Sequence, residues 1–165
     1  MNIQHELFEG DGTIPNNTEL PLLVYKTAFS EKEEFENALK KNSWNGAWVN
    51  GVYSYHHFHS SAHEVLGVLS GRAEVLFGGE DGRKLLLEKG DVAIIPAGVG
   101  HKCLQKDADF QVMGAYPDNQ EMDMCTGKPE EYENAFSRIK QVPLPLNDPF
   151  FGRDGPLFEY WKAGE

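Results

Sequence analysis

The chain has 165 residues, of which 40% are hydrophobic and 12% aromatic, so it is long and apolar enough to fold as a globular domain. Its formal net charge is −11 and its basic residues form no cluster. This charge argues against binding to the phosphate backbone of a nucleic acid or to an anionic membrane surface, and we expect neither partner.

The sequence contains no visible targeting or membrane segment. Residues Met1 to Glu6 include neither a basic cluster nor an apolar run, so we expect no signal peptide. No apolar run approaches the roughly 20 residues that a membrane-spanning helix needs. Two cysteines, Cys103 and Cys125, make no disulfide framework. These features together favour a cytoplasmic protein.

The first 47 residues are predicted to contain one strand and one helix. Residues 20–25 are expected to form an edge strand, where Pro21 is tolerated. Ser30 and Glu33 have the spacing of a capping box, which predicts a helix over residues 30–41. Asn45-Gly46 then turns the chain.

From Trp48 to Tyr116, short apolar segments alternate with turn signals. The predicted strands are 48–59, 63–69, 72–77, 83–87, 91–96, 101–106 and 109–116. Glycine-containing turns such as Ser70-Gly71 connect them. Many short antiparallel strands at this spacing predict an all-β sandwich or barrel.

The segment after the strands is predicted to be helical and then extended. Pro129 suits the first turn of a helix over 129–140, with Tyr132, Phe136 and Ile139 on its buried stripe. The proline-rich residues 142–149 should run extended over the surface. The apolar side chains of this tail need cover from the barrel or from a second subunit. Together with the open edges of a short sheet, they lead us to expect a homodimer.

Three histidines and one carboxylate stand at spacings typical of a single metal site. His57 and His59 are two positions apart, so on a strand they share a face and can bind one ion together. Glu64 and His101 come from later strands and reach the same ion only if the sheet curls up. The spacing therefore predicts both a site and a barrel around it.

These residues belong to two longer patterns. The first is G-x5-H-x-H-x4-E-x6-G, from Gly51 to Gly71, and the second is G-x5-P-x-G-x2-H-x3-Q, from Gly90 to Gln105. They resemble the two signature motifs of the cupin superfamily at every fixed position except the last, where Gln105 replaces Asn. The resemblance covers about a third of the chain, which is similar to small single-domain bacterial cupins.

The resemblance implies a jelly-roll barrel, or double-stranded β-helix, with the helices 30–41 and 129–140 beside it. A single cupin domain would span residues 1–165, with a barrel core at 48–116, an N-terminal arm at 1–47 and a C-terminal extension at 117–165.

The resemblance also implies that His57, His59, Glu64 and His101 are ligands of a divalent transition metal. Imidazole and carboxylate together suit iron, manganese, nickel, zinc or cobalt. About two coordination positions would stay open in an octahedron, as a catalytic site requires.

Three further side chains are candidates for acid or base catalysis. If His57 and His59 face inward, alternation along the strand brings Tyr53 and Tyr55 inward as well, unless these tyrosines serve only core packing. His63 stands beside a turn and either donates a hydrogen bond to Glu64 or to the substrate, or faces outward.

The same alternation places Cys103 and Gln105 inward beside His101. Cys103 is expected to behave as a small buried hydrophobe. Gln105 would hold a ligand histidine or bond the backbone.

Two functional hypotheses remain open. In the first, the protein is a metal-dependent enzyme acting on a small organic substrate. It would be a dioxygenase or oxidase with iron, or an isomerase, lyase or hydrolase with manganese, nickel or zinc. In the second, it is a binding or sensor module in which the metal holds a ligand without turnover.

Overall fold

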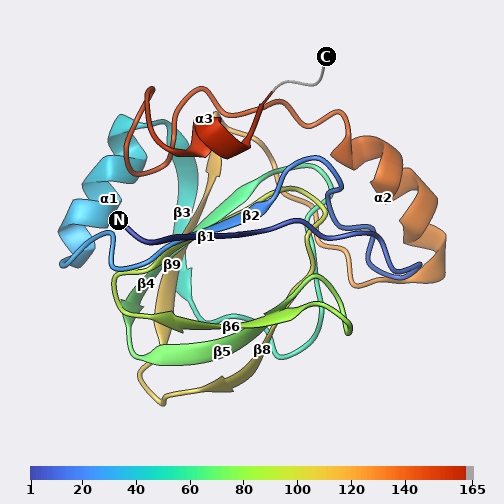
Figure 1. The fold of residues 1–165 in the computed structure, drawn as a ribbon, viewed down its shortest axis with the longest axis horizontal. Coiled ribbons are helices and arrows are strands. Elements are labelled where there is room, and N and C mark those ends of the chain that lie inside the picture. Colours follow the sequence, from blue (N-terminus) through green and yellow to red (C-terminus); the bar gives the residue numbers. More distant parts are fainter. Residues whose placement is uncertain (163–165) are drawn as a thin grey trace.

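The computed structural model describes residues 1–162 and arranges them as two antiparallel sheets that face each other (Figure 1). The larger sheet has six strands in the order β1-β2-β7-β4-β9-β3, and the smaller has three in the order β6-β5-β8. The strands are β1 Ile3–Glu6, β2 Leu22–Tyr25, β3 Trp44–Asn50, β4 Glu64–Ser70, β5 Arg72–Phe77, β6 Arg83–Glu88, β7 Val92–Ile95, β8 His101–Lys106 and β9 Gln111–Pro117. This architecture confirms the predicted jelly-roll barrel.

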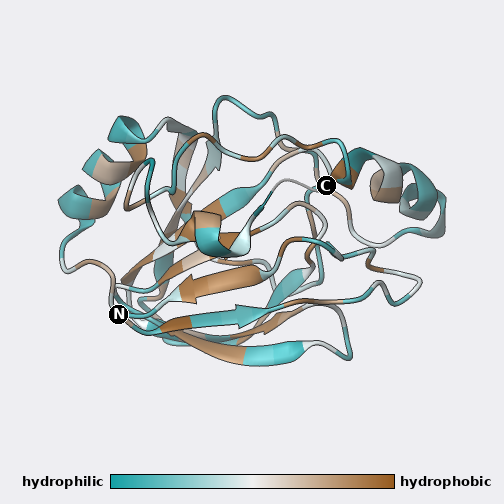
Figure 2. Cartoon of the chain, turned by 45° about the horizontal axis from the view of Figure 1, so that its top comes forward, coloured by the Kyte–Doolittle hydropathy of each residue, from teal (hydrophilic) through white to brown (hydrophobic). Residues whose placement is uncertain are grey.

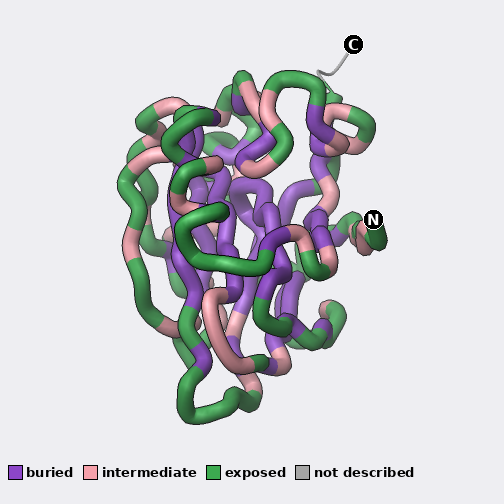
Figure 3. The backbone as a smooth tube through the Cα atoms, turned by 90° about the vertical axis from the view of Figure 1, so that its left-hand side faces the viewer, coloured by how far each residue is buried: buried purple, intermediate pink, exposed green. Residues whose placement is uncertain are grey.

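The inner faces of the two sheets enclose the main apolar core. On β6, Leu85 and Leu87 are buried while Lys84 and Leu86 are exposed, as expected for a strand with one face on a core. Figure 3 shows the same contrast for the whole chain, with buried strands inside and exposed connections around them. The buried members of this core include Val24, Leu66, Val75, Leu87 and Val112.

A second apolar layer covers the outer face of the six-stranded sheet. Helix α1 (Lys32–Lys41) contributes Phe35 and Leu39, and the tail with α3 (Leu157–Tyr160) contributes Leu157 and Trp161. Gly67 of β4 makes room for this layer, because a Cβ there would lie 2.4 Å from the Phe35 ring. The apolar tail therefore packs on the barrel of its own chain, which is one of the two arrangements expected from the sequence.

The helices are short and largely hydrophilic on their outer sides (Figure 2). Helix α1 begins two residues later than predicted, and the capping box of Ser30 and Glu33 does not form. Instead, the Ser30 N–H donates to Oε1 of Glu34 at 2.9 Å. No helix within residues 1–162 has the length and apolar character needed to cross a membrane.

The second predicted helix is a 3₁₀ turn, η1 (Pro129–Glu131), followed by α2 (Tyr132–Ile139). Its buried residues are Ala135 and Ile139, whereas Tyr132 and Phe136 are only half-buried. Of the three residues predicted to be buried on this helix, only Ile139 is buried.

Two predictions about the strands are wrong. The strand over residues 20–25 is internal, because the unpredicted β1 pairs with β2 on the side away from β7. The strand over 48–59 does not form as one element, since β3 ends at Asn50 and the following residues make only isolated bridges, His57 to His101 and Phe58 to Cys125. Side chains in this segment consequently do not follow strand alternation.

Candidate metal centre

Three of the four predicted ligands form one buried cluster. His59, Glu64 and His101 each offer a donor atom, and these atoms all lie within 4.8 Å of one another. Nε2 of His59 is 3.3 Å from Oε2 of Glu64, and Nε2 of His101 is 3.3 Å from Oε1 of the same carboxylate. One metal ion can be held between these donors.

The cluster is assembled where strands begin. Glu64 is the first residue of β4 and lies opposite Ile95 of β7, and His101 is the first residue of β8. His59 comes from the irregular segment before β4, where its carbonyl oxygen accepts the Gly98 N–H at 2.7 Å. The turn at Gly98 therefore ties the His59 backbone to the chain that leads into His101.

Backbone carbonyl groups orient the histidine rings. Each Nδ1 lies within hydrogen-bond distance of a carbonyl oxygen: 2.5 Å for His59 to Asp123, 3.1 Å for His101 to Val99, and 3.1 Å for His57 to Tyr55. An Nδ1–H that donates to a carbonyl leaves the lone pair on Nε2, the nitrogen through which a neutral imidazole then binds metal. For His59 and His101, this nitrogen is the one that faces Glu64.

His57 borders the cluster without belonging to it. Its backbone exchanges hydrogen bonds with His101, at 3.2 and 3.0 Å, and the two ring centroids are 4.1 Å apart. Burial, with the nearby His101, lowers the pKa of His57 to about 3. Its imidazole is therefore neutral at pH 7 and keeps a lone pair available for a ligand.

The charges in the cluster depend on one another. Burial opposes ionisation of Glu64, but hydrogen bonds from His101 and His59 outweigh it and hold the pKa of this carboxyl well below its usual range. Burial also opposes a charge on His59, but the hydrogen bond to Glu64 and the charge of that carboxylate prevail and raise the pKa of the imidazole. Without a metal, the cluster thus keeps a buried carboxylate beside a histidine that readily takes a proton.

A cavity of about 390 Å³ opens onto the cluster. His57, His59, Glu64 and His101 all line it, so the candidate ligands face the cavity. The other lining residues are Trp48, Val49, Asn50, Gly51, Val52, Tyr53, Leu66, Lys106, Tyr116, Met122 and Met124. The volume is enough for a small organic molecule next to a bound ion.

Comparison with known proteins gives the family. The cupin domain model matches residues 48–112. The uncharacterized protein YjlB of Bacillus subtilis (strain 168) is 46% identical over 158 residues, which are 96% of each chain. The chain belongs to the cupin superfamily.

Solved structures similar to this cupin include a DUF861 family protein from Thermotoga maritima, with 25% identity and a TM-score of 0.37 over 58% of this chain and 96% of that one. Another is acireductone dioxygenase from Bacillus anthracis with a cadmium ion in its active centre, with 19% identity and a TM-score of 0.36 over 58% and 60% of the two chains. Both likenesses are too remote to indicate a reaction.

The three candidate acid–base residues of this cupin lie in different places. Tyr53 lines the cavity mouth and is 50% exposed. Tyr55 is 48% exposed and stacks on Tyr53 at 5.0 Å between ring centroids, outside the cavity lining. Tyr55 was predicted to point inward by strand alternation, and this prediction is wrong because the segment is not a strand.

His63 is fully buried on the side of the sheet away from the cavity. Its Nδ1 accepts the Ala97 N–H at 2.9 Å, and its ring packs on Trp161 at 4.8 Å. It follows that His63 reaches neither the cavity nor the Glu64 carboxylate, and we assign it no acid–base role.

Tyr116 was not predicted as a site residue, although it lines the cavity. Its hydroxyl accepts the indole N–H of Trp48 at 2.9 Å. Burial and the neighbouring Glu64 carboxylate raise the pKa of Tyr116, so the phenol keeps its proton at neutral pH. Alternation along β9 would have found this residue, since Val112 and Tyr116 are four positions apart and face the same side.

The predictions for β8 are right for one residue and wrong for another. Cys103 is buried in the main core, as expected. Gln105 is exposed instead of inward, and Lys106 lines the cavity. The cause is a β-bulge in the pairing of β5 with β8.

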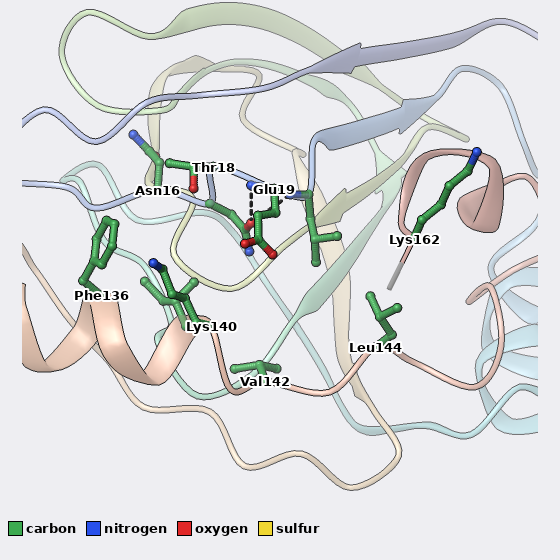
Figure 4. Close-up of a pocket in the computed structure, with 11 residues that line it drawn as sticks. Asn16, Thr18, Glu19, Phe136, Lys140, Val142, Leu144 and Lys162 are labelled. Atoms are coloured by element: carbon green, nitrogen blue, oxygen red, sulfur yellow. Dashed lines mark hydrogen bonds between the residues drawn. The ribbon is translucent and has the colours of Figure 1, made fainter. Parts of the chain in front are cut away.

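A smaller cavity of about 140 Å³ lies away from the metal centre (Figure 4). It is lined by residues 16–20 on one side and by residues of α2 and the C-terminal tail on the other. Its lining carries Glu19, Lys140 and Lys162, and neither histidine nor cysteine among the described residues. This cavity offers no competing metal site.

Proposed function

We propose that this cupin binds one divalent transition-metal ion through His59, Glu64 and His101, with His57 as a fourth ligand, and acts as an enzyme on a small organic molecule held beside the ion. The observation that carries the proposal is the buried cluster of two imidazole nitrogens and one carboxylate, which faces a cavity of about 390 Å³.

The donor set fits a divalent ion. Imidazole with carboxylate suits Fe(II), Mn(II), Ni(II) and Zn(II), and thiolates are not needed. Glu64 is 3% exposed, and its carboxylate would be costly to bury without positive charge beside it. A bound cation compensates this charge while both facing histidines stay neutral.

When bound, the ion would supply Lewis-acid activation of a substrate oxygen and, if it is iron, redox chemistry with O₂. The protein supplies the rest. The Trp48 indole N–H donates to the Tyr116 hydroxyl oxygen. The phenol proton is therefore free to be donated toward Glu64 and the cavity. Tyr116 is therefore the best-placed group to hold a proton next to a substrate, and Tyr53 is a second, at the mouth.

These groups serve two reaction classes equally well. One is oxidation by O₂, as in a dioxygenase or oxidase, and the other is proton-transfer chemistry, as in an isomerase or lyase. The alternative to both is a cupin that binds a small ligand without turnover, for which the same cavity and metal centre suffice.

The test is a metal titration of wild type, His59→Ala and the control His56→Ala, followed by assays of turnover. His56 neighbours the site in sequence, but its ring lies 3.1 Å from Glu80 and does not line the cavity. We expect one ion per chain in wild type and His56→Ala, and at least about a hundredfold weaker binding in His59→Ala. Wild type that binds no ion, or His59→Ala that binds it equally well, would overturn the metal site.

Turnover separates the enzyme from the binding module. Wild type loaded with Fe(II) is assayed for O₂ uptake, and wild type loaded with Mn(II), Ni(II) or Zn(II) is assayed by NMR for isomerisation or decarboxylation of small organic acids. Turnover that is lost in His59→Ala supports the enzyme. Ligand binding without turnover in either assay supports the alternative.

A further inference from the structure

The cavity contains a cationic side chain that the metal centre does not use. Lys106 stands opposite Ala73 of β5, just as His101 stands opposite Phe77 of the same strand. Residues opposite each other in an antiparallel pair have their side chains on the same face. Ala73 and Phe77 both belong to the core between the sheets, so Lys106 starts from the inner face of β8, as His101 does.

A β-bulge creates this orientation. The pairing of β5 with β8 shifts between Cys103 and Gln105, which are opposite the consecutive residues Val75 and Glu74. Strict alternation from His101 would have brought Gln105 inward and turned Lys106 out to solvent. Both residues are exposed, but the bulge brings Lys106, and not Gln105, into the cavity lining. Bulges next to functional sites often redirect a side chain in this way.

The charge of Lys106 is not compensated by the protein. Within residues 1–162, its ammonium group forms no ion pair, whereas Lys102 of the same strand binds Glu80 at 3.0 Å. Nζ of Lys106 lies beside the cavity-lining Gly51, 3.8 Å from where a Cβ on that glycine would stand. In a chain of net charge −11, a free cation at this mouth is available to an anionic ligand.

Apart from the metal centre and Lys106, the cavity is lined by residues without charge. His101 and Lys106 begin and end β8, which separates their Cα atoms by about 15 Å along the strand. The lining includes six large apolar side chains, Trp48, Val49, Val52, Leu66, Met122 and Met124, together with the uncharged polar Asn50, Tyr53 and Tyr116. A ligand that fills this space needs an apolar body.

We propose that the cavity takes a small organic monocarboxylate with an apolar body, whose carboxylate binds Lys106 while its other end reaches the metal centre. This inference rests on the proposed function, because it names the substrate class of the same site. Lys106 is then the residue that determines specificity for an anion, by a charge-assisted hydrogen bond at the cavity mouth.

The experiment compares carboxylates with their neutral amides on the full chain loaded with Mn(II). The probes are 3-phenylpropanoate, 4-(methylthio)butanoate and hexanoate, each paired with its amide, and binding is measured by calorimetry. The proteins are wild type, Lys106→Met, Lys106→Arg and the matched control Lys102→Met. Mn(II) affinity is measured first in all four.

We expect wild type and Lys102→Met to bind at least one carboxylate about tenfold more tightly than its amide. Lys106→Met should lose this preference through weaker carboxylate binding, with amide binding and Mn(II) affinity unchanged, and Lys106→Arg should retain it. The inference is overturned if wild type prefers no carboxylate, or if Lys106→Met keeps the full preference, in which case the ion alone binds the anion. Failure of wild type to bind Mn(II) would instead reject the proposed function, and the preference would then be measured on the metal-free proteins.

Discussion

Nδ1 of His59 lies 2.5 Å from the carbonyl oxygen of Asp123, a residue of the loop that follows β9. The Asp123 side chain holds this loop in place, because its carboxylate accepts the Ser60 N–H at 2.6 Å as well as the Ser60 hydroxyl. Arg138 of α2 adds a contact of 3.6 Å to the same carboxylate. The orientation of a candidate metal ligand thus depends on the C-terminal extension.

Replacing Asp123 by Ala should therefore weaken metal binding without removing a ligand. We expect about tenfold lower affinity, because the carbonyl group that orients His59 is no longer fixed by the side chain. Glu121→Ala is the control, since Glu121 is exposed and only its backbone carbonyl is used, by the Ser61 hydroxyl. Calorimetric titration of both variants with Mn(II) measures the effect. Equal affinities would show that the loop does not position the histidine.

His59 should make metal binding weaker as the pH falls. Its pKa in the metal-free protein is raised above 6.5, so a metal ion must displace a proton at any pH below that raised value. The affinity should fall as the pH decreases below that raised value, by up to about tenfold per pH unit. His57, with a pKa of about 3, adds nothing in this range. Titrations from pH 8.5 to 5.5 check this, and an affinity that stays constant over the whole range would contradict it.

His63 should make the stability of the metal-free protein depend on pH. Burial lowers its pKa to about 3, from about 6.5 in the unfolded chain. As the pH falls, His63 therefore takes up a proton in the unfolded chain before it does so in the folded protein. The free energy of unfolding should decrease between about pH 6.5 and pH 3, by up to about 1.4 kcal/mol per pH unit. Urea denaturation of wild type and His63→Asn between pH 7 and 5 measures the slope. The slope should be smaller in the variant, and identical slopes would be inconsistent with a neutral buried His63.

Gly114 leaves the space that the Trp48 indole fills. A Cβ at residue 114 would lie 2.3 Å from Cζ2 of Trp48, so Gly114→Ala should displace the indole and break its bond to the Tyr116 hydroxyl. We expect destabilisation of about 1–3 kcal/mol and a change in tryptophan fluorescence. Gly51→Ala is the control, because the nearest atom there is 3.8 Å away. Two variants of equal stability would show that the indole is not confined at Gly114.

The strands from Glu64 onward were predicted within a few residues, since alternating apolar side chains and glycine turns mark them. β5 has the predicted bounds, Arg72–Phe77. Residues 51–59 were mistaken for part of a strand because their histidines alternate, although their backbone forms only the isolated bridges at His57 and Phe58. β1 was missed because Ile3-Gln4-His5-Glu6 has hardly any apolar signal and depends on β2 for its pairing.

The centre of the site was predictable, and its surroundings were not. His59, Glu64 and His101 stand at fixed spacings around the strand starts, so their convergence follows from the motifs. Lys106 reaches the cavity through a bulge, and Asp123 reaches His59 through a loop. Neither feature leaves a periodic pattern in the sequence, and both become visible only once the strands are paired.

The most direct test of the metal centre is anomalous diffraction from crystals soaked in Zn(II), recorded at the zinc edge. The account predicts one strong peak per chain, at about 2.0–2.2 Å from Nε2 of His59, Nε2 of His101 and the Glu64 carboxylate, with Nε2 of His57 as the fourth donor. No peak among these atoms, or a peak whose ligands exclude Glu64, would contradict it.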